Sequence, residues 1–241
     1  MQHRNVTGTI RYTSKKPDML DQARGRETFN FSHHSDGSVI MRAYCEIEEP
    51  SPTVMRDIIY ALNPDRVPQY LHVHLTVGDR FMGSGWIRNN VDDGTIECES
   101  FGPDIGRLSQ QVKANGDFDG FGTHPVVGDG FLTRCMDLSQ GPHRRNVRVF
   151  LPSPDHRGAT PPMISEVVIG LEYVGEEEKT VEAGTFQCRH FRYIDDIGEG
   201  MGGTTHPTYD MWVTADDDSI LVYGSIDGSM MNRYELVELQ R

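Results

Sequence analysis

The sequence lacks the features that would identify a membrane, redox or nucleotide-binding protein. Only four cysteines occur in 241 residues and no two form a Cys-x-x-Cys pair, so a disulfide framework or zinc ribbon is not indicated. No run of 18 apolar residues occurs, so no transmembrane helix is expected. The first residues lack an apolar segment, so we expect no signal peptide and a cytoplasmic location. Neither a Gly-x-Ser-x-Gly elbow nor a P-loop is present.

Positive charge is also scarce. The chain carries 23 Lys and Arg against 36 Asp and Glu, for a net charge of -13. A surface this negative repels phosphate backbones and anionic membranes, so neither nucleic acid nor a membrane is an expected partner. With 37% hydrophobic and 24% charged residues, the composition is that of a soluble globular protein.

Short segments of alternating apolar and polar residues, joined by Asp-Gly turns, dominate the chain. The run 39–48 places Val39, Met41 and Ala43 on one face, and Asp36-Gly37 precedes it as a hairpin turn. Asp93-Gly94 and Asp227-Gly228 mark two further hairpins. The alternation predicts strands at 6–13, 27–34, 39–48, 70–77, 81–88, 95–101, 146–151, 163–174, 180–194, 208–214, 219–226 and 229–239.

These strands predict an all-β fold with little helix. We expect one β domain over residues 1–241, with two loosely similar halves at about 1–125 and 126–241. The sheet is expected to be antiparallel and strongly curled, forming a half-barrel or barrel with an internal cavity that hides its edges. The segments 54–62 and 105–113 fit either strand or helix, with strand favoured for the first.

Two glycine-rich regions interrupt the pattern. Residues 114–145 are the most irregular, with a helical turn expected at 130–138. The run 198–203 is predicted to be a plain hairpin loop or a lid over the barrel mouth. Two short His-Pro segments, His124-Pro125 and His206-Pro207, echo each other, and chance explains this match about as well as duplication does.

The last part of the chain resembles a bacterial family of unknown function. The resemblance rests on about 60 residues: the segment 179–190, which contains Val-Glu-Ala-Gly-Thr-Phe, the segment Tyr209–Val213 with Trp212, and the closing strands. It implies a large antiparallel half-barrel related in shape to lipoprotein carriers. It implies no catalytic residues.

His72 and His74 are the sharpest candidates for chemistry. They alternate with Leu71, Val73 and Leu75, so a strand would place both imidazoles on one face. With Glu97 or Glu99 from a nearby predicted strand as a third ligand, they would form a divalent metal site such as zinc. A cavity-lining catalytic role and an exposed polar strand face are the alternatives, and the last is favoured.

His124 and Asp129 form the second candidate pair. They flank a glycine-containing loop, where a histidine could act as general base and the aspartate could orient it. The alternative is a turn in which both side chains bond to their own backbone.

The functional prediction is a small-molecule protein. We expect a hydrophobic or aromatic ligand in the barrel cavity, lined by Tyr70, Trp86, Met211 and Trp212. Histidine acid–base chemistry of a lyase, isomerase or hydrolase type, without an organic cofactor, is slightly favoured. The alternative is a non-catalytic carrier or sensor of a lipophilic ligand. Long sheet edges make a homodimer plausible.

Overall fold

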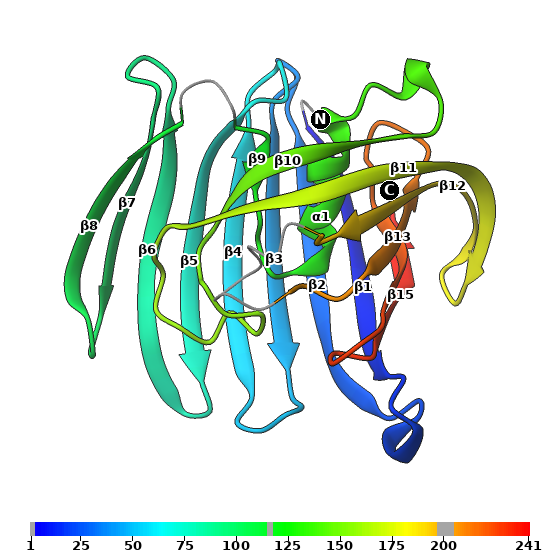
Figure 1. Cartoon of the computed structure of the whole chain (residues 1–241), viewed down its shortest axis with the longest axis horizontal. Helices are drawn as coiled ribbons and strands as arrows, with labels where there is room; N and C mark the ends of the chain where they lie inside the picture. The colour runs from blue at the N-terminus through cyan, green and yellow to red at the C-terminus, as the bar shows by residue number, and fades with distance from the viewer. Residues whose placement is uncertain (1–2, 115–117, 197–204) are drawn as a thin grey trace.

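One continuous sheet organises the molecule (Figure 1). The computed structural model describes residues 3–114, 118–196 and 205–241, so the glycine run at 198–203 lies outside the described residues. The strand order runs from β8 to β1 and then from β15 to β9. Adjacent strands are antiparallel, apart from the parallel pair β9 and β10. Within the described residues, no helix is long and apolar enough to cross a membrane.

The strands of the sheet alternate with short turns, and all the helical segments except η1 lie between β9 and β10. The strands are β1 (Arg4–Ser14), β2 (Ala23–His33), β3 (Val39–Ile47), β4 (Val54–Leu62), β5 (Pro68–Val77), β6 (Arg80–Asn90), β7 (Thr95–Gly102), β8 (Gly106–Lys113), β9 (Gly120–Phe121), β10 (His143–Leu151), β11 (Ser165–Val181), β12 (Gly184–Ile194), β13 (Tyr209–Thr214), β14 (Leu221–Ile226) and β15 (Asn232–Gln240). The helical segments are η1 (Pro17–Met19), η2 (Val126–Gly128), α1 (Asp129–Leu132), η3 (Thr133–Cys135) and η4 (Leu138–Gln140).

The predicted all-β, curled antiparallel fold is confirmed. Both uncertain segments are strands, β4 and β8, and helical turns cover most of the segment 130–138. The Asp-Gly turns lie between strands as expected. At the first of them, Gly37 has φ +92° and the Asp36 carboxylate accepts a 2.8 Å hydrogen bond from the Ser38 amide. That left-handed φ is readily available only to glycine.

The largest error in a predicted strand boundary lies at Gly175. The sequence pattern predicts separate strands at 163–174 and 180–194. Instead β11 continues to Val181, and Gly175 marks a shift of register against β12. The chain reverses at residues 182–183, directly before Gly184. The glycine therefore makes a bulge inside a long strand rather than ending it.

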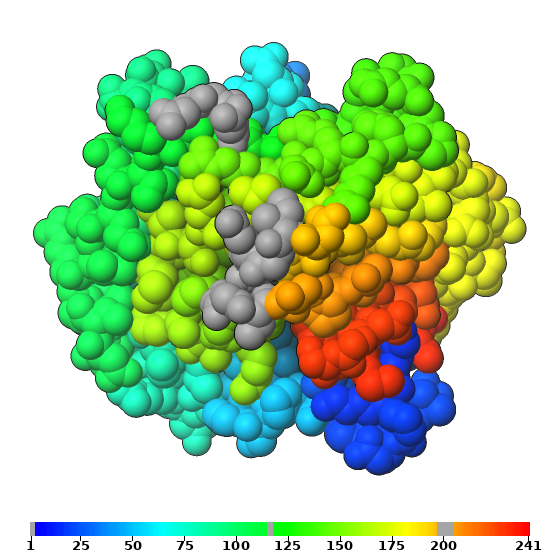
Figure 2. Space-filling view, in the orientation of Figure 1, coloured from blue at the N-terminus to red at the C-terminus, as the bar shows by residue number. Residues whose placement is uncertain are grey.

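The sheet has two arms that fold toward each other. The first arm, β1–β8, and the second, β9–β15, meet at the β1–β15 pair. In Figure 1 the strands β10 and β11 pass in front of the first arm, and α1 lies between the arms. The space-filling view shows the second arm covering the middle of the first (Figure 2). The arms therefore enclose an interior, as in a half-barrel.

Aromatic contacts join the arms through the helical turn. Phe131 of α1 packs on Phe31 of β2 and on Tyr60 of β4, with ring centroids 5.0 and 5.4 Å apart. Tyr60 also contacts Phe121 of β9, and its hydroxyl accepts a 3.2 Å hydrogen bond from the Phe121 amide. These side chains are almost fully buried. Burial of such large rings is a major source of stability, so the turn is fixed in place.

Candidate functional site

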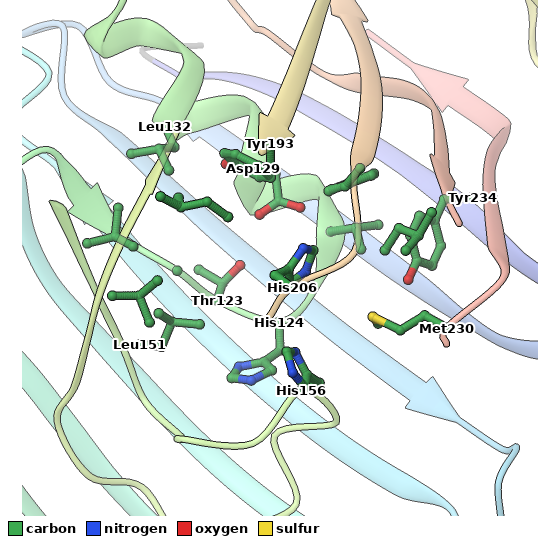
Figure 3. Close-up of a pocket in the computed structure, with 17 residues that line it drawn as sticks. Thr123, His124, Asp129, Leu132, Leu151, His156, Tyr193, His206, Met230 and Tyr234 are labelled. Atoms are coloured by element: carbon green, nitrogen blue, oxygen red, sulfur yellow. The ribbon is translucent and has the colours of Figure 1, made fainter. Parts of the chain in front are cut away.

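A pocket of about 130 Å³ lies next to α1, and its lining residues come from the second arm and the segments that connect its strands (Figure 3). One wall is apolar, and its side chains come from α1 and the inner faces of β10 and β11. Val149 and Val167 are cross-strand partners in this wall, and strand alternation also turns Ile169 inward. This part of the pocket therefore offers only apolar contact to a ligand.

The opposite wall is made of tyrosines. Tyr193 on β12 is the cross-strand partner of Tyr209 on β13, and their ring centroids lie 5.7 Å apart. Tyr234 on β15 lies 5.9 Å from Tyr209. All three are at least nine-tenths buried, and the Tyr193 hydroxyl has no hydrogen-bond partner among the described residues. A buried hydroxyl without a partner is costly, so this group is free to bind a ligand.

Asp129, the first residue of α1, supplies the carboxyl group of the pocket. Burial raises its pKa to about 8, the charge of nearby Glu27 adds to the rise, and the neighbouring Tyr209 hydroxyl opposes it. No Lys, Arg or His forms an ion pair with Asp129 within the described part of the chain. At neutral pH this carboxyl is therefore mostly protonated.

Glu27 lies behind the pocket and fixes its shape. The residue is fully buried on β2, and its carboxylate accepts 2.8 Å hydrogen bonds from the amides of Val126 and Val127. It also accepts a hydrogen bond from the Tyr12 hydroxyl. Burial raises the pKa of Glu27 to about 7, although the three donors oppose that rise. Glu27 thus anchors the turn that carries Asp129.

His124 occupies a strained turn at the pocket. Its φ is +70°, a left-handed conformation that is uncommon outside glycine. The Nε2 atom lies 3.0 Å from the carbonyl oxygen of Asp155, which can only accept a hydrogen bond, so Nε2 carries the proton. Burial, with the nearby Arg56 cation, lowers the pKa of His124 to about 3. The imidazole is therefore neutral, and Nδ1 presents a lone pair without a partner.

Two further histidines line the pocket. His206 precedes β13, and its Nδ1 lies 2.6 Å from the Pro207 carbonyl oxygen. Burial lowers its pKa, so this imidazole is also neutral, with the proton on Nδ1. His156 belongs to the loop after β10, and its ring lies 5.5 Å from that of His206. Figure 3 shows the Asp129 carboxyl pointing toward the side of the pocket that holds His206.

The structure brings His124 and Asp129 to one pocket but places His72 and His74 elsewhere. These two lie on the outer face of β5, where Trp86 pairs with His72 and Phe81 stacks on His74. Tyr70 is on the same outer face. The aromatic and histidine side chains of β5 and β6 therefore do not reach the interior.

No three His, Cys, Asp or Glu side chains gather closely enough to hold a metal ion, as far as the described ranges extend. The alternative metal site on His72 and His74 does not form. Glu97 pairs with Arg88, which pairs with Tyr70, so Glu97 lies in the row of Tyr70 rather than that of His72. Glu99 lies in the row of His72, with Trp86 between them, and its carboxylate accepts hydrogen bonds from Arg107 and Ser109.

Met211 and Trp212 are adjacent on β13 and point to opposite faces. Met211 is fully buried in the core and does not line the pocket. Trp212 faces outward, where His190 stacks on its ring at 4.2 Å and the Lys179 ammonium lies 3.7 Å from the ring centroid. Neither side chain contributes to the pocket.

Tyr193, Tyr209 and Tyr234 of the tyrosine wall, and Glu27 behind the pocket, are not among the residues selected from the sequence. Glu27 carried a usable signal, because it alternates with Phe29 and Phe31 and is thus an acid on an apolar strand face. The echo between His124-Pro125 and His206-Pro207 was a second signal, since both histidines line the pocket.

Comparisons with known proteins identify the fold and nothing finer. No family model matches the chain, and no curated protein matches it. The fold is similar to that of a β-barrel-like protein of the domain of unknown function DUF1849 from Brucella abortus, with a TM-score of 0.57, 14% identity, and coverage of 99% of this chain and 96% of that chain. A protein with a YmcC-like fold from Bacteroides fragilis gives a TM-score of 0.42 and 9% identity, covering 98% of this chain and 95% of that chain. The chain therefore shares its architecture with bacterial β-barrel-like proteins.

Proposed function

We propose that this chain binds a compact, mostly apolar small molecule in its interior pocket and does not transform it. The observation that carries this proposal is the pocket itself, in which apolar side chains surround a small number of polar groups from different strands. An apolar cavity of about 150 Å³ binds benzene, and this pocket, at about 130 Å³, is only slightly smaller. The occupant would therefore be a ring-sized molecule, or the ring-sized end of a larger one.

The state of His124 favours binding over histidine acid–base chemistry. A general base works best when its pKa is near the operating pH, and a pKa of about 3 makes His124 a weak base. The bond from its Nε2 goes to the Asp155 carbonyl rather than to Asp129. The expected arrangement of a histidine oriented by Asp129 is thus not formed.

Asp129 supports a second candidate, an enzyme that uses acid–base chemistry without an organic cofactor. A pocket carboxyl with a pKa of about 8 is poised to donate and accept a proton near neutral pH. In that case Asp129, rather than a histidine, would carry the proton. Incubating small molecules with the protein and analysing them by mass spectrometry separates the two functions. A binding protein leaves the mass of its ligand unchanged, whereas an enzyme yields a product.

The resemblance of the segment 179–190 to a half-barrel family related to lipoprotein carriers supports a binding role. The proposal keeps the other expectations from the sequence: a lipophilic small molecule as partner, a cytoplasmic location, no organic cofactor, and a homodimer as one assembly compatible with the sheet edges. None of these expectations is needed for the pocket to bind a ligand.

The test is a titration with toluene, followed by backbone NMR. We expect chemical shift changes at residues that line the pocket, and we expect Val167→Phe to abolish them by filling the space. Val168→Phe is the matched control, because the next residue on β11 points to the outer face. Absence of shifts in the wild-type pocket at saturating toluene, or equal shifts in both variants, would refute the proposal.

A further inference from the structure

The pocket contains an acid that has no basic partner among the described residues. Asp129 forms no ion pair with a basic side chain in the ranges the structure describes, and the nearest charged neighbour that affects it is another acid, Glu27. Buried carboxylates are normally paired with a cation or a metal. A ligand that brought a positive charge to Asp129 would supply the missing partner.

The tyrosine wall adds two kinds of attraction for a cation. The linked rings of Tyr193, Tyr209 and Tyr234 provide the electron-rich surfaces that attract ammonium groups. The Tyr193 hydroxyl, which has no partner, offers an oxygen lone pair to an N–H donor. The negative charge of Asp129 contributes to the raised pKa of each of the three tyrosines, so all three hydroxyl groups lie close to that carboxyl.

The histidines favour the same kind of ligand. His124 and His206 each have one ring nitrogen at hydrogen-bond distance from a backbone carbonyl oxygen, so the other nitrogen is an acceptor in the neutral ring. Among the residues that the structure describes, no Lys or Arg lines the pocket. An anionic ligand would therefore meet acceptors and a buried acid, whereas a ligand with several N–H groups would find partners.

We propose that the pocket recognises a small primary amine in its protonated form, with the ammonium group on Asp129 and a ring-sized apolar body against Val149, Val167 and Ile169. This inference rests on the proposed function, because it names the class of ligand that the same pocket takes. The ammonium group would lie between the carboxyl and the tyrosine wall, where N–H donors find the Tyr193 hydroxyl.

Proton release is the distinctive consequence. Because free Asp129 is mostly protonated at pH 7, binding of an ammonium ion to its carboxylate must expel that proton. The affinity should then rise about tenfold per pH unit up to about pH 8. The other groups that face Asp129 are Glu27 on β2, the three tyrosines, and the pocket histidines His124, His156 and His206, while Arg56 lies next to His124. A neutral ligand bound to the protonated acid would show the opposite trend or none.

The experiment compares three probes of nearly equal size: benzylamine, benzyl alcohol and benzoate. Affinity is measured by isothermal titration calorimetry at pH 6, 7 and 8, in two buffers with different ionisation enthalpies, so that released protons are counted. At pH 8 we expect benzylamine to bind at least about tenfold more tightly than benzyl alcohol. The affinity for benzylamine should rise by about tenfold per pH unit up to about pH 8, and its binding at pH 7 should release close to one proton.

Three variants locate the effect. Asp129→Asn should abolish the preference for benzylamine and the proton release while leaving benzyl alcohol binding within about threefold. Tyr193→Phe should weaken benzylamine binding with the carboxyl intact. Asp92→Asn removes one exposed negative charge far from the pocket and should change neither quantity.

The outcomes separate the two proposals. If benzyl alcohol or benzoate binds as tightly as benzylamine, or if benzylamine binding is independent of pH and of Asp129, the amine inference is wrong while pocket binding stands. If none of the three probes binds and toluene also fails, both proposals are wrong.

Discussion

The Glu27 carboxylate on β2 accepts a 2.8 Å hydrogen bond from the backbone N–H of Val127, two residues before Asp129. This bond and its companion from Val126 tie the first arm of the sheet to the turn that carries the pocket acid. The position of Asp129 therefore depends on a residue about 100 positions earlier in the chain. Glu27 also raises the pKa of Asp129, so the two acids are linked in geometry and in charge.

Replacement of Glu27 should destabilise the fold and the pocket together. Glu27→Ala leaves two buried amides without acceptors, each at a cost of about 1–3 kcal/mol in free energy of unfolding. Glu27→Gln keeps one carbonyl acceptor and should lose less. Urea denaturation at pH 7 measures both losses, and the exposed Glu238→Ala should change stability by no more than about 0.5 kcal/mol. A loss below about 1 kcal/mol for Glu27→Ala would show that these bonds do not anchor the turn.

Asp129→Asn should change how stability depends on pH. The folded-state pKa of about 8 lies above the usual value in an unfolded chain, so the folded state holds the proton more tightly. The stability that this group contributes is present below about pH 4 and is lost as pH rises through about 8. The wild type should therefore lose stability relative to Asp129→Asn over this range, by an amount on the order of several kcal/mol.

Denaturation curves of both proteins at pH 5, 6, 7 and 8 measure that difference. Glu27 titrates in both proteins, so the difference between the two curves reports Asp129 together with its effect on the titration of Glu27. A constant difference from pH 5 to 8 would mean that Asp129 is already ionised in the folded protein. It would also remove the basis for proton release by an amine ligand.

The sequence predicted the sheet well because its signals are local. Alternation and Asp-Gly turns located nearly every strand, and the largest boundary error, at Gly175, arose because a glycine bulge and a turn have the same composition. The pocket depends instead on which strands face each other. Tyr193 and Tyr234 are far apart in sequence and reach one wall only because β12 to β15 lie side by side, with Tyr209 in contact with both rings. For His72, by contrast, the local pattern points to the outer face, because the histidines of β5 alternate with the buried Leu71, Val73 and Leu75.

Arg56 should be essential for the loop beside His124. This arginine is 1% exposed, and its Nη2 donates hydrogen bonds of 2.8 and 2.5 Å to the carbonyls of Arg157 and Gly158. Arg56→Met preserves much of the apolar stem but leaves those carbonyls without donors, so a loss of about 3 kcal/mol is expected. The loss of the cation should also raise the pKa of His124, which is measured by following its imidazole signals by NMR. An unchanged pKa of His124 in Arg56→Met would show that the Arg56 cation does not lower it.

Trp212 provides a final test, because the sequence placed it in the ligand site and the structure places it on the outer face. Lys179→Met removes the cation over the Trp212 ring and should cost about 0.5–1 kcal/mol of stability, the usual size of an exposed cation–π contact. It should leave the affinity for toluene and benzylamine unchanged.

Because Trp86 also lies on the outer face, ligand binding should not alter tryptophan emission in the wild type. Quenching by benzylamine that disappears in Trp212→Phe would mean that the ligand binds at the outer cluster of Lys179, His190 and Trp212 instead of the pocket.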